Sequence, residues 1–526
     1  MTETNLRAQA LSERTILGHP AGLFVLFMTE MWERFSYYGM RALLVLYLTK
    51  HFLFDREAAY GLYGAYTTLV YITPVLGGYL ADRYLGQRKA VMIGAILLVL
   101  GHAGMAIEGE PVLAGETPDP GILNIFYFSL ALIIAGVGFL KANISTIVGE
   151  LYTKTDVRRD SAFTIFYIGI NVGAAIGALL AGFLGETYGW RYGFGAAGIG
   201  MLLGLLVFIW GKPTLKGAGE PPNPEELKKK HIGGLTTEWL IYIGTAVMTL
   251  VLWFMVRDQG TVNIVLMVFG AIVVGYILWH SVFSLVPHAR DRILASLVLI
   301  SLQILFWGLF EQTGSSLNLF TDEQVDRNML GWEVPASMFQ SINAIYIVLL
   351  GPIFAWLWTY LGRHGWEPST PNKFALGLIQ LGLGFLVLVW GANAANGLTP
   401  VVFIFMIYLL HTTGELCLSP VGLSAMTRLS VPSMVGLIMG TWFLASGAGN
   451  AVAALIAQAT AAVGADGESQ VLEVYSNVGW MSIAVGGAVV LASPLLKWLM
   501  HLDTLSDEDS GLQSDHPKMI ARDEPM

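Results

Sequence analysis

Long apolar segments recur along the whole chain, and they limit its possible folds more than any other feature of the sequence. Fourteen runs approach or exceed the ~18 residues that an α-helix needs to cross a bilayer. We expect membrane-spanning helices at 21–50, 58–81, 88–107, 121–150, 161–186, 192–211, 236–256, 263–286, 293–320, 336–362, 374–394, 400–427, 435–462 and 474–500. The runs form a six-plus-two-plus-six pattern.

The composition fits the same conclusion. Hydrophobic residues make up 55% of the chain and charged residues 13%, whereas a soluble domain carries roughly a quarter charged residues. Sixty glycines suit helices whose backbones approach closely. The single cysteine, Cys417, excludes a disulfide framework. We expect no cleavable signal peptide, since residues 1–16 are polar. We also expect no nucleic-acid partner, and the net charge of −9 needs no partner to explain it, because much of it lies in the tail after Leu502.

Basic residues gather in alternate loops, which defines an orientation because short cytoplasmic loops are rich in Lys and Arg. The basic loops contain Arg83, Arg88 and Lys89; Lys154, Arg158 and Arg159; Lys212, Lys216, Lys228, Lys229 and Lys230; and Arg363 and Lys373. The loops at 108–120, 321–335 and 463–473 are mostly acidic. We therefore predict a multi-pass protein of the cell inner membrane with both termini in the cytoplasm.

The same pattern predicts the domain organisation. The expected parts are a cytoplasmic N-terminus (1–20), an N-terminal six-helix bundle (21–211), a cytoplasmic linker (212–235), two inserted transmembrane helices (236–286), a C-terminal six-helix bundle (287–500) and an acidic cytoplasmic tail (501–526). Two six-helix halves joined in this way are the layout of the major facilitator superfamily. Residues 77–89 (GGYLADRYLGQRK) resemble its loop motif between spans two and three, or else form an ordinary basic turn. The predicted fold class is an all-α membrane protein with 14 transmembrane helices.

The first span carries charges that are costly inside a membrane. Six polar residues fall on one helical face, at positions 30, 33, 34, 37, 38 and 41: Glu30, Glu33, Arg34, Tyr37, Tyr38 and Arg41. Each charge at mid-bilayer costs about 2.5–3.5 kcal/mol on insertion scales. The stripe is tolerable if its charges pair and face a wet cavity. The alternative is a structural ion-pair cluster that holds helices together.

Other spans add isolated polar groups. Lys141 lies well inside the fourth span, or snorkels from its end. In the seventh span, Trp307 and Glu311 lie one turn apart, with Asn318 expected further along the same face. The tenth span places His411, Glu415 and Ser419 four residues apart, and His411 is the one best read as a core histidine. Intramembrane carboxylates such as Glu311 and Glu415 are functional candidates by default.

Acids and bases contributed by both halves suit a substrate with a positive and a negative end. A free peptide is such a zwitterion, and a cavity that holds its two termini would ignore most side chains. The residues alone leave other zwitterions and small anions open.

Three segments resemble motifs of the proton-dependent oligopeptide transporter (POT/PTR) family. Residues 30–39 match E-x-x-E-R-F-x-Y-Y-G, residues 166–173 match F-Y-x-x-x-N-x-G on span five, and residues 414–420 match G-E-x-x-x-S-P on span ten. The two inserted helices are typical of bacterial members. The resemblance implies a proton-coupled symporter that imports di- and tripeptides by alternating access.

The resemblance also implies residue roles. Arg34 and Lys141 would hold the peptide carboxylate, and Glu415, assisted by Asn343, the amino group. The expected substrate-binding residues are Arg34, Tyr37, Tyr38, Tyr71, Lys141, Asn171, Trp307, Asn343, Glu415, Ser419 and Trp442. Proton coupling is expected at Glu30, Glu33, Arg34, Glu311 and Glu415, and a gating ion pair between Arg41 and Glu311. Animal members carry a histidine on span two, where this chain has Gly64.

No cofactor other than the coupling proton is expected, and no metal. The expected partners are the small-molecule substrate and membrane lipid; a monomer would suffice for transport, and the sequence does not define an oligomeric state. The rival interpretations are a symporter of the same fold for an amino-acid derivative, nitrate or a sugar, a gated channel, and a membrane-embedded enzyme or receptor. Nitrate carries no amino group for Glu415 to bind, which disfavours it as the substrate. No nucleotide-binding loop or catalytic triad is recognisable in the sequence, which disfavours an enzyme.

Overall fold

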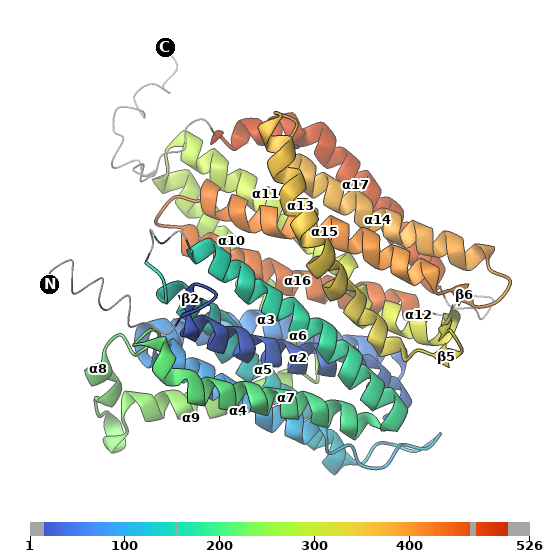
Figure 1. The fold of residues 1–526 in the computed structure, drawn as a ribbon, viewed down its shortest axis with the longest axis horizontal. Coiled ribbons are helices and arrows are strands. Elements are labelled where there is room, and N and C mark those ends of the chain that lie inside the picture. Colours follow the sequence, from blue (N-terminus) through green and yellow to red (C-terminus); the bar gives the residue numbers. More distant parts are fainter. Residues whose placement is uncertain (1–14, 154–155, 157, 463–469, 503–526) are drawn as a thin grey trace. The chain divides into compact units, whose positions relative to one another are not determined.

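The computed structural model describes residues 15–153, 156, 158–462 and 470–502. Long helices dominate it (Figure 1). Their bounds are α2 Ala21–Lys50, α3 Arg56–Leu80, α4 Gln87–Met105, α5 Pro120–Glu150, α6 Arg159–Tyr188, α7 Trp190–Gly211, α9 Thr237–Met255, α10 Gln259–Ser284, α11 Pro287–Phe310, α13 Ser341–Arg363, α14 Thr370–Ala394, α15 Val402–Leu429, α16 Val435–Ala461 and α17 Val471–Leu499. Most of the predicted segments 1–20 and 463–473, nearly all of the tail 501–526, and Lys154 lie outside the described residues.

Within the described part of the chain, twelve helical segments are long and apolar enough to cross a membrane. Helices α2 and α3 are not among the twelve, although their 30 and 25 residues exceed the roughly 20 that a span needs. In α2 the reason lies in its charges, which lower the mean hydropathy of the segment. The protein is therefore a multi-pass membrane protein. The predicted count of fourteen spans includes α2 and α3 and stays a prediction.

The predicted seventh span is not one continuous helix. Helix α11 ends at Phe310, a 3₁₀ turn follows at Glu311–Gly314, and α12 (Ser316–Gln324) resumes after a non-helical Ser315. Asn318 therefore does not lie on one continuous helix with Trp307 and Glu311, and the expectation that the three share a face stays a prediction. Broken helices at membrane depth occur where other protein groups satisfy the freed backbone.

Side chains around the break supply those partners. The Gln312 amide donates to the carbonyl oxygens of Gly308 at 3.0 Å and Ala453 at 2.9 Å. Ser316 donates to Gln312 Oε1 at 2.6 Å and lies 2.8 Å from the hydroxyl of Tyr475 on α17. Gln312 thus links α11, α12 and α16, and it fixes the position of the neighbouring Glu311.

The chain divides into two compact units. Unit 1 comprises 1–47, 72–257 and 337–345, and unit 2 comprises 48–71, 258–336 and 346–526. The inserted helices fall on opposite sides of this division: α9 packs on α5 in unit 1, whereas α10 packs on α16 and α11 in unit 2. The domain boundaries predicted from the sequence stay a prediction.

Glycine pairs allow the tightest helix contacts within each unit. In unit 1, a Cβ on Gly94 of α4 would lie 2.6 Å from the carbonyl oxygen of Gly136 on α5. In unit 2, a Cβ on Gly382 of α14 would lie 2.4 Å from the carbonyl oxygen of Gly479 on α17. Real Cβ atoms essentially never come so close, so these helices pack backbone to backbone.

The linker folds against the basic loop of unit 1. After a π-helical turn at Ala81–Leu85, Gly86 adopts φ +72° directly beside the backbone of Glu220. Arg88 pairs with Glu220 at 2.6 Å, and Lys89 pairs with Glu238 of α9 at 2.5 Å. The superfamily-like stretch 77–89 therefore binds the linker and α9.

Strands are minor in the described chain. Three pairs of two-residue strands occur: β1 (Thr15–Ile16) with β2 (His19–Pro20), β3 (Val325–Asp326) with β6 (Thr399–Pro400), and β4 (Asn328–Met329) with β5 (Trp332–Glu333). They join loop segments at helix ends.

Candidate functional site in two helical units

The charged stripe of α2 is buried in unit 1. The side chains of Glu30, Glu33 and Arg34 are at most 4% exposed. Arg34 Nε lies 3.1 Å from Glu30 Oε1 and also pairs with Glu33, so two carboxylates share one guanidinium. Each of the three groups keeps one buried polar atom without a hydrogen-bond partner among the described residues: Glu30 Oε2, Glu33 Oε1 and Arg34 Nη2. The cluster therefore retains hydrogen-bonding capacity for a proton or a ligand.

Two tyrosines extend this stripe. The guanidinium carbon of Arg34 lies 5.4 Å from the ring centre of Tyr37, and that of Arg41 lies 5.8 Å from the ring centre of Tyr38. The two rings meet edge to face at 5.1 Å. Arg34 and Arg41 are thus each held against an aromatic ring, an arrangement that favours a cation in a dry environment.

Helix α5 adds a second cation to unit 1. Lys141 is half-buried, and its charge acts on the carboxylate of Glu30. Two residues after Lys141, the side-chain amide of Asn143 donates to the carbonyl oxygens of Phe139 at 2.8 Å and Gly77 at 3.3 Å. The bond to Gly77 joins α5 to α3. Sequence reasoning missed Asn143, although an amide inside an apolar run was a visible signal.

The motif on α6 lies directly against the stripe of α2. Asn171 is 5% exposed and donates to the carbonyl oxygen of Tyr167 at 3.0 Å. A Cβ on Gly173 would lie 2.1 Å from the carbonyl oxygen of Met31 and 3.0 Å from Cβ of Arg34. The last glycine of the α6 motif therefore sets the distance between α6 and the charged face of α2.

The last glycine of the α2 motif has the same purpose. A Cβ on Gly39 would lie 3.0 Å from the carbonyl oxygen of Gly177 and 2.9 Å from Cβ of Ala181, both on α6. Gly173 and Gly177 are one turn apart, so the two motifs fit together along two helical turns.

In unit 2, Trp307 and Glu311 lie at the C-terminal end of α11. Trp307 packs closely against Gly449 of α16: a Cβ added to Gly449 would lie only 2.5 Å from Cβ of Trp307. Glu311 is 3% exposed at the first residue of the helix break. The carboxylate is thus placed where the α-helix gives way to a 3₁₀ turn.

Helix α15 carries the third motif. A Cβ on Gly414 would lie 2.8 Å from the carbonyl oxygen of Gly377 on α14, so the backbone beside Glu415 is fixed by α14. Glu415 and Ser419 are half-buried on successive turns. His411 is 1% exposed and its ring centre lies 4.9 Å from that of Phe385, which agrees with its interpretation as a core residue.

Trp442 of α16 is 3% exposed and lies against α15. Its ring fills the space where Gly422 lacks a side chain, 2.0 Å from the position a Cβ would take. Gln303 of α11 donates to the Trp442 carbonyl oxygen at 3.3 Å and to Ser446 Oγ at 2.7 Å. Sequence reasoning missed Gln303 and Gln312, whose signal was an amide within an apolar segment.

The position that matches the histidine of animal members has no room for a side chain. A Cβ on Gly64 would lie 2.2 Å from Cβ of Ala454 on α16, within unit 2. Helices α3 and α16 therefore pack too closely here for an imidazole.

The predicted partners Arg41 and Glu311 belong to different units, as do Asn343 and Glu415. Tyr71 belongs to unit 2, at the point where α3 passes from one unit to the other. These pairings, and the roles assigned to all the site residues, stay predictions.

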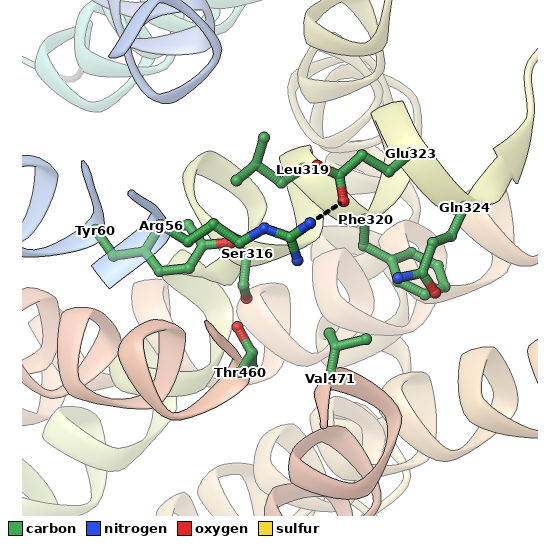
Figure 2. Close-up of a pocket in the computed structure, with 9 residues that line it drawn as sticks. All are labelled: Arg56, Tyr60, Ser316, Leu319, Phe320, Glu323, Gln324, Thr460 and Val471. Atoms are coloured by element: carbon green, nitrogen blue, oxygen red, sulfur yellow. Dashed lines mark hydrogen bonds and ion pairs between the residues drawn. The ribbon is translucent and has the colours of Figure 1, made fainter. Parts of the chain in front are cut away.

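Unit 2 also contains ion pairs that join the end of α2 and the start of α3 to α12. Lys50 pairs with Asp322 at 2.6 Å, and Arg56 pairs with Glu323 at 2.7 Å. Figure 2 shows the guanidinium of Arg56 reaching Glu323 across a small hollow that Tyr60 and other side chains line. The hollow has about 10 Å³, enough for about one water molecule and too small for a substrate.

The described chain has many membrane-spanning helices, a helix break at the buried carboxylate of Glu311, and a buried cluster of paired charges on α2. Together these features define a membrane transporter of the secondary class. Comparison with known proteins then identifies the family. A model of the POT family matches residues 88–478, and the chain belongs to this family.

Related proteins agree with this assignment. The chain is 37% identical over 470 residues to the peptide transporter YePEPT of Yersinia enterocolitica, covering 84% of this chain and 88% of the relative. A crystal structure of a peptide transporter POT in complex with sulfate is 33% identical and has a TM-score of 0.79, covering 95% and 100% of the two chains. A POT family transporter in complex with 5-aminolevulinic acid is 29% identical, with a TM-score of 0.79 and coverage of 93% and 99%.

These similarities confirm two predictions from the sequence. The fold is that of the major facilitator superfamily, in an all-α membrane protein. The protein is a transporter and not an enzyme.

Proposed function

We propose that this protein is a proton-coupled symporter that imports di- and tripeptides across the cell inner membrane by alternating access. Membership of the POT family supports the class of substrate. The observation in the structure that carries the coupling mechanism is the buried cluster in which Glu30 and Glu33 share Arg34.

Coupling follows from competition within this cluster. Two carboxylates beside one guanidinium cannot both be fully neutralised by it, so one of them is suited to accept a proton. Protonation of Glu33 or Glu30 releases part of the positive charge of Arg34, whose Nη2 has no hydrogen-bond partner among the described residues. Arg34 is then available to a peptide carboxylate. Proton and peptide thereby favour the same state, as symport requires.

The remaining residues follow from the zwitterionic substrate. Lys141 lies on α5 of the same unit and adds charge at the carboxylate end. Glu415, with Asn343, binds the amino end, and Tyr37, Tyr38, Tyr71, Asn171, Trp307, Ser419 and Trp442 line the pocket. Arg41 and Glu311 form the gating ion pair. The membrane potential adds about 2.3 kcal/mol per charge per 100 mV, which drives accumulation.

A second substrate class is an amino-acid derivative. The observation in its favour is the related POT family transporter in complex with 5-aminolevulinic acid, which also carries an amino group and a carboxylate. 5-Aminolevulinic acid separates its amino group from its carboxylate by the same number of backbone bonds as a dipeptide, so dipeptide length alone does not distinguish the two substrate classes. Competition by the longer tripeptides, which only a peptide site accepts, separates them.

The test is uptake of labelled dialanine into proteoliposomes with and without an inward proton gradient. We expect gradient-driven accumulation that other di- and tripeptides inhibit. No uptake by folded protein across an intact gradient would contradict the proposed substrate. Inhibition by 5-aminolevulinic acid but not by tripeptides would favour the second class.

The Glu33→Gln variant tests the coupling step. It keeps a neutral hydrogen-bonding group beside Arg34 but cannot take up a proton, so we expect peptide exchange to persist while pH-driven accumulation is lost. Full accumulation in this variant would remove Glu33 from the mechanism, and the same experiment on Glu30→Gln would then decide whether its neighbour carries the proton.

A further inference from the structure

A cavity at one end of unit 2 has no part in the proposed transport site. It has a volume of about 500 Å³ and lies between the start of α14, the second half of α15 and the end of α17. Helices α14 and α17 run side by side in Figure 1. The basic loop that leads into α14 predicts that this end faces the cytoplasm.

The charge of this cavity is unbalanced. Three cations line it, Lys373, Arg428 and Lys497, against one carboxylate, Glu367. Glu367 already pairs with Lys373, which also lies 4.4 Å from the ring centre of Trp358. Arg428 and Lys497 are exposed and form no ion pair with any residue that the structure describes. Two positive charges therefore remain for an anion.

The wall of the cavity adds hydrogen-bond donors. Helix α14 is 25 residues long, and the side chain of its N-cap residue, Ser369, does not cap it. The Ser369 hydroxyl lies instead 3.1 Å from that of Ser493 on α17. The positive end of the α14 dipole thus contributes to the same cavity, together with the hydroxyls of Thr370 and Ser424.

Neighbouring side chains place the cavity at the depth of lipid headgroups. Trp498 follows Lys497 directly and is 62% exposed, and Trp366, one residue before Glu367, is 71% exposed. Exposed tryptophans gather at the boundary between lipid and water. One turn before Trp498, Leu495 is also exposed, which continues the apolar surface toward the bilayer.

We propose that this cavity binds the headgroup of an anionic phospholipid, with Arg428 and Lys497 on the phosphate. The exposed apolar face of α17 receives the acyl chains. Basic pockets between helices on the cytoplasmic side are suited to such lipids because the inner leaflet is anionic. None of the residues that line the cavity is among the predicted substrate-binding residues.

Native mass spectrometry of the full chain, titrated with phosphatidylglycerol or phosphatidylcholine, tests the proposal. The double variant Arg428→Ala/Lys497→Ala is expected to weaken phosphatidylglycerol binding about thirtyfold, with no change for phosphatidylcholine. The control Lys229→Ala/Lys230→Ala removes the same charge from exposed linker residues and keeps binding. The swap Arg428→Lys/Lys497→Arg keeps both charges and is expected to keep binding. Unchanged phosphatidylcholine binding by the alanine variant shows that its loss of phosphatidylglycerol is not due to misfolding.

Two results overturn the proposal. Equal binding by wild type and Arg428→Ala/Lys497→Ala would show that the cavity does not hold the lipid. Displacement of phosphatidylglycerol by millimolar inorganic phosphate would assign the cavity to free phosphate, since a lipid held also through its acyl chains resists that competitor.

Discussion

The contact between α6 and α2 at Gly173 gives the sharpest prediction from the structure. In Gly173→Ala, the new Cβ would lie 2.1 Å from the carbonyl oxygen of Met31, where real contacts are at least 3.0 Å. The helices must therefore separate by about 0.9 Å. Overpacking of this kind costs about 1–3 kcal/mol. At about 1 °C per kcal/mol for a chain of 526 residues, the Tm falls by about 1–3 °C.

Transport is expected to suffer more than stability. The same Cβ would lie 3.0 Å from Cβ of Arg34, so the displacement occurs at the guanidinium shared by Glu30 and Glu33. A misplacement of about 1 Å at a reacting centre costs on the order of 100-fold in rate. We expect a loss of that order in proton-driven dialanine uptake, measured in proteoliposomes at equal protein content.

Gly195→Ala on α7 is the matched control. It makes the same chemical change in a helix of the same unit, but nothing lies within 4 Å of the new Cβ. Because alanine is the better helix former, its Tm should be unchanged or slightly higher. Fluorescence of the native tryptophans during heating measures both variants. If Gly173→Ala matches Gly195→Ala in Tm and in uptake, the close contact does not position Arg34.

Three further predictions concern other contacts. Gln312→Leu leaves buried carbonyl oxygens unsatisfied at the α11 break, so we expect about 1–3 kcal/mol of destabilisation. A thiol-reactive dye that reaches buried Cys417 only on unfolding measures the Tm. An unchanged Tm would show that the break does not need the hydrogen bonds of Gln312. Glu323→Gln removes an exposed ion pair with Arg56 and should cost at most about 1 kcal/mol, an effect that 1 M salt abolishes; a salt-independent loss would contradict this. Hydrogen bonds from Arg158 hold the pKa of Asp156 at about 2, so its contribution to stability is complete above about pH 4 and is lost as the pH falls through about 2. The Tm difference between wild type and Asp156→Asn should follow that course, and a difference of the same size at pH 6 and at pH 2 would refute it.

The sequence by itself determined the membrane class and the helix positions. Runs of about 20 apolar residues have one stable solution in lipid, and the observed helix α5, Pro120–Glu150, departs from the expected 121–150 by one residue. The charged stripe of α2 was also predictable, because 3.6-residue periodicity is a local property and charges in a span are rare. The motif resemblance then identified the family before any tertiary contact was known.

Only the tertiary structure decided which residues meet. The break at Glu311 was invisible because residues 293–320 read as one apolar run, and it depends on Gln312 reaching the backbone of α16. Likewise, no local pattern shows that Gly173 faces Met31 and Arg34. A glycine in a helix can equally lie on an open surface, as Gly275 does, where an added Cβ would have no atom within 4 Å. Periodicity defines a face of a helix, but the partner of that face is fixed by long-range packing, which sequence spacing does not encode.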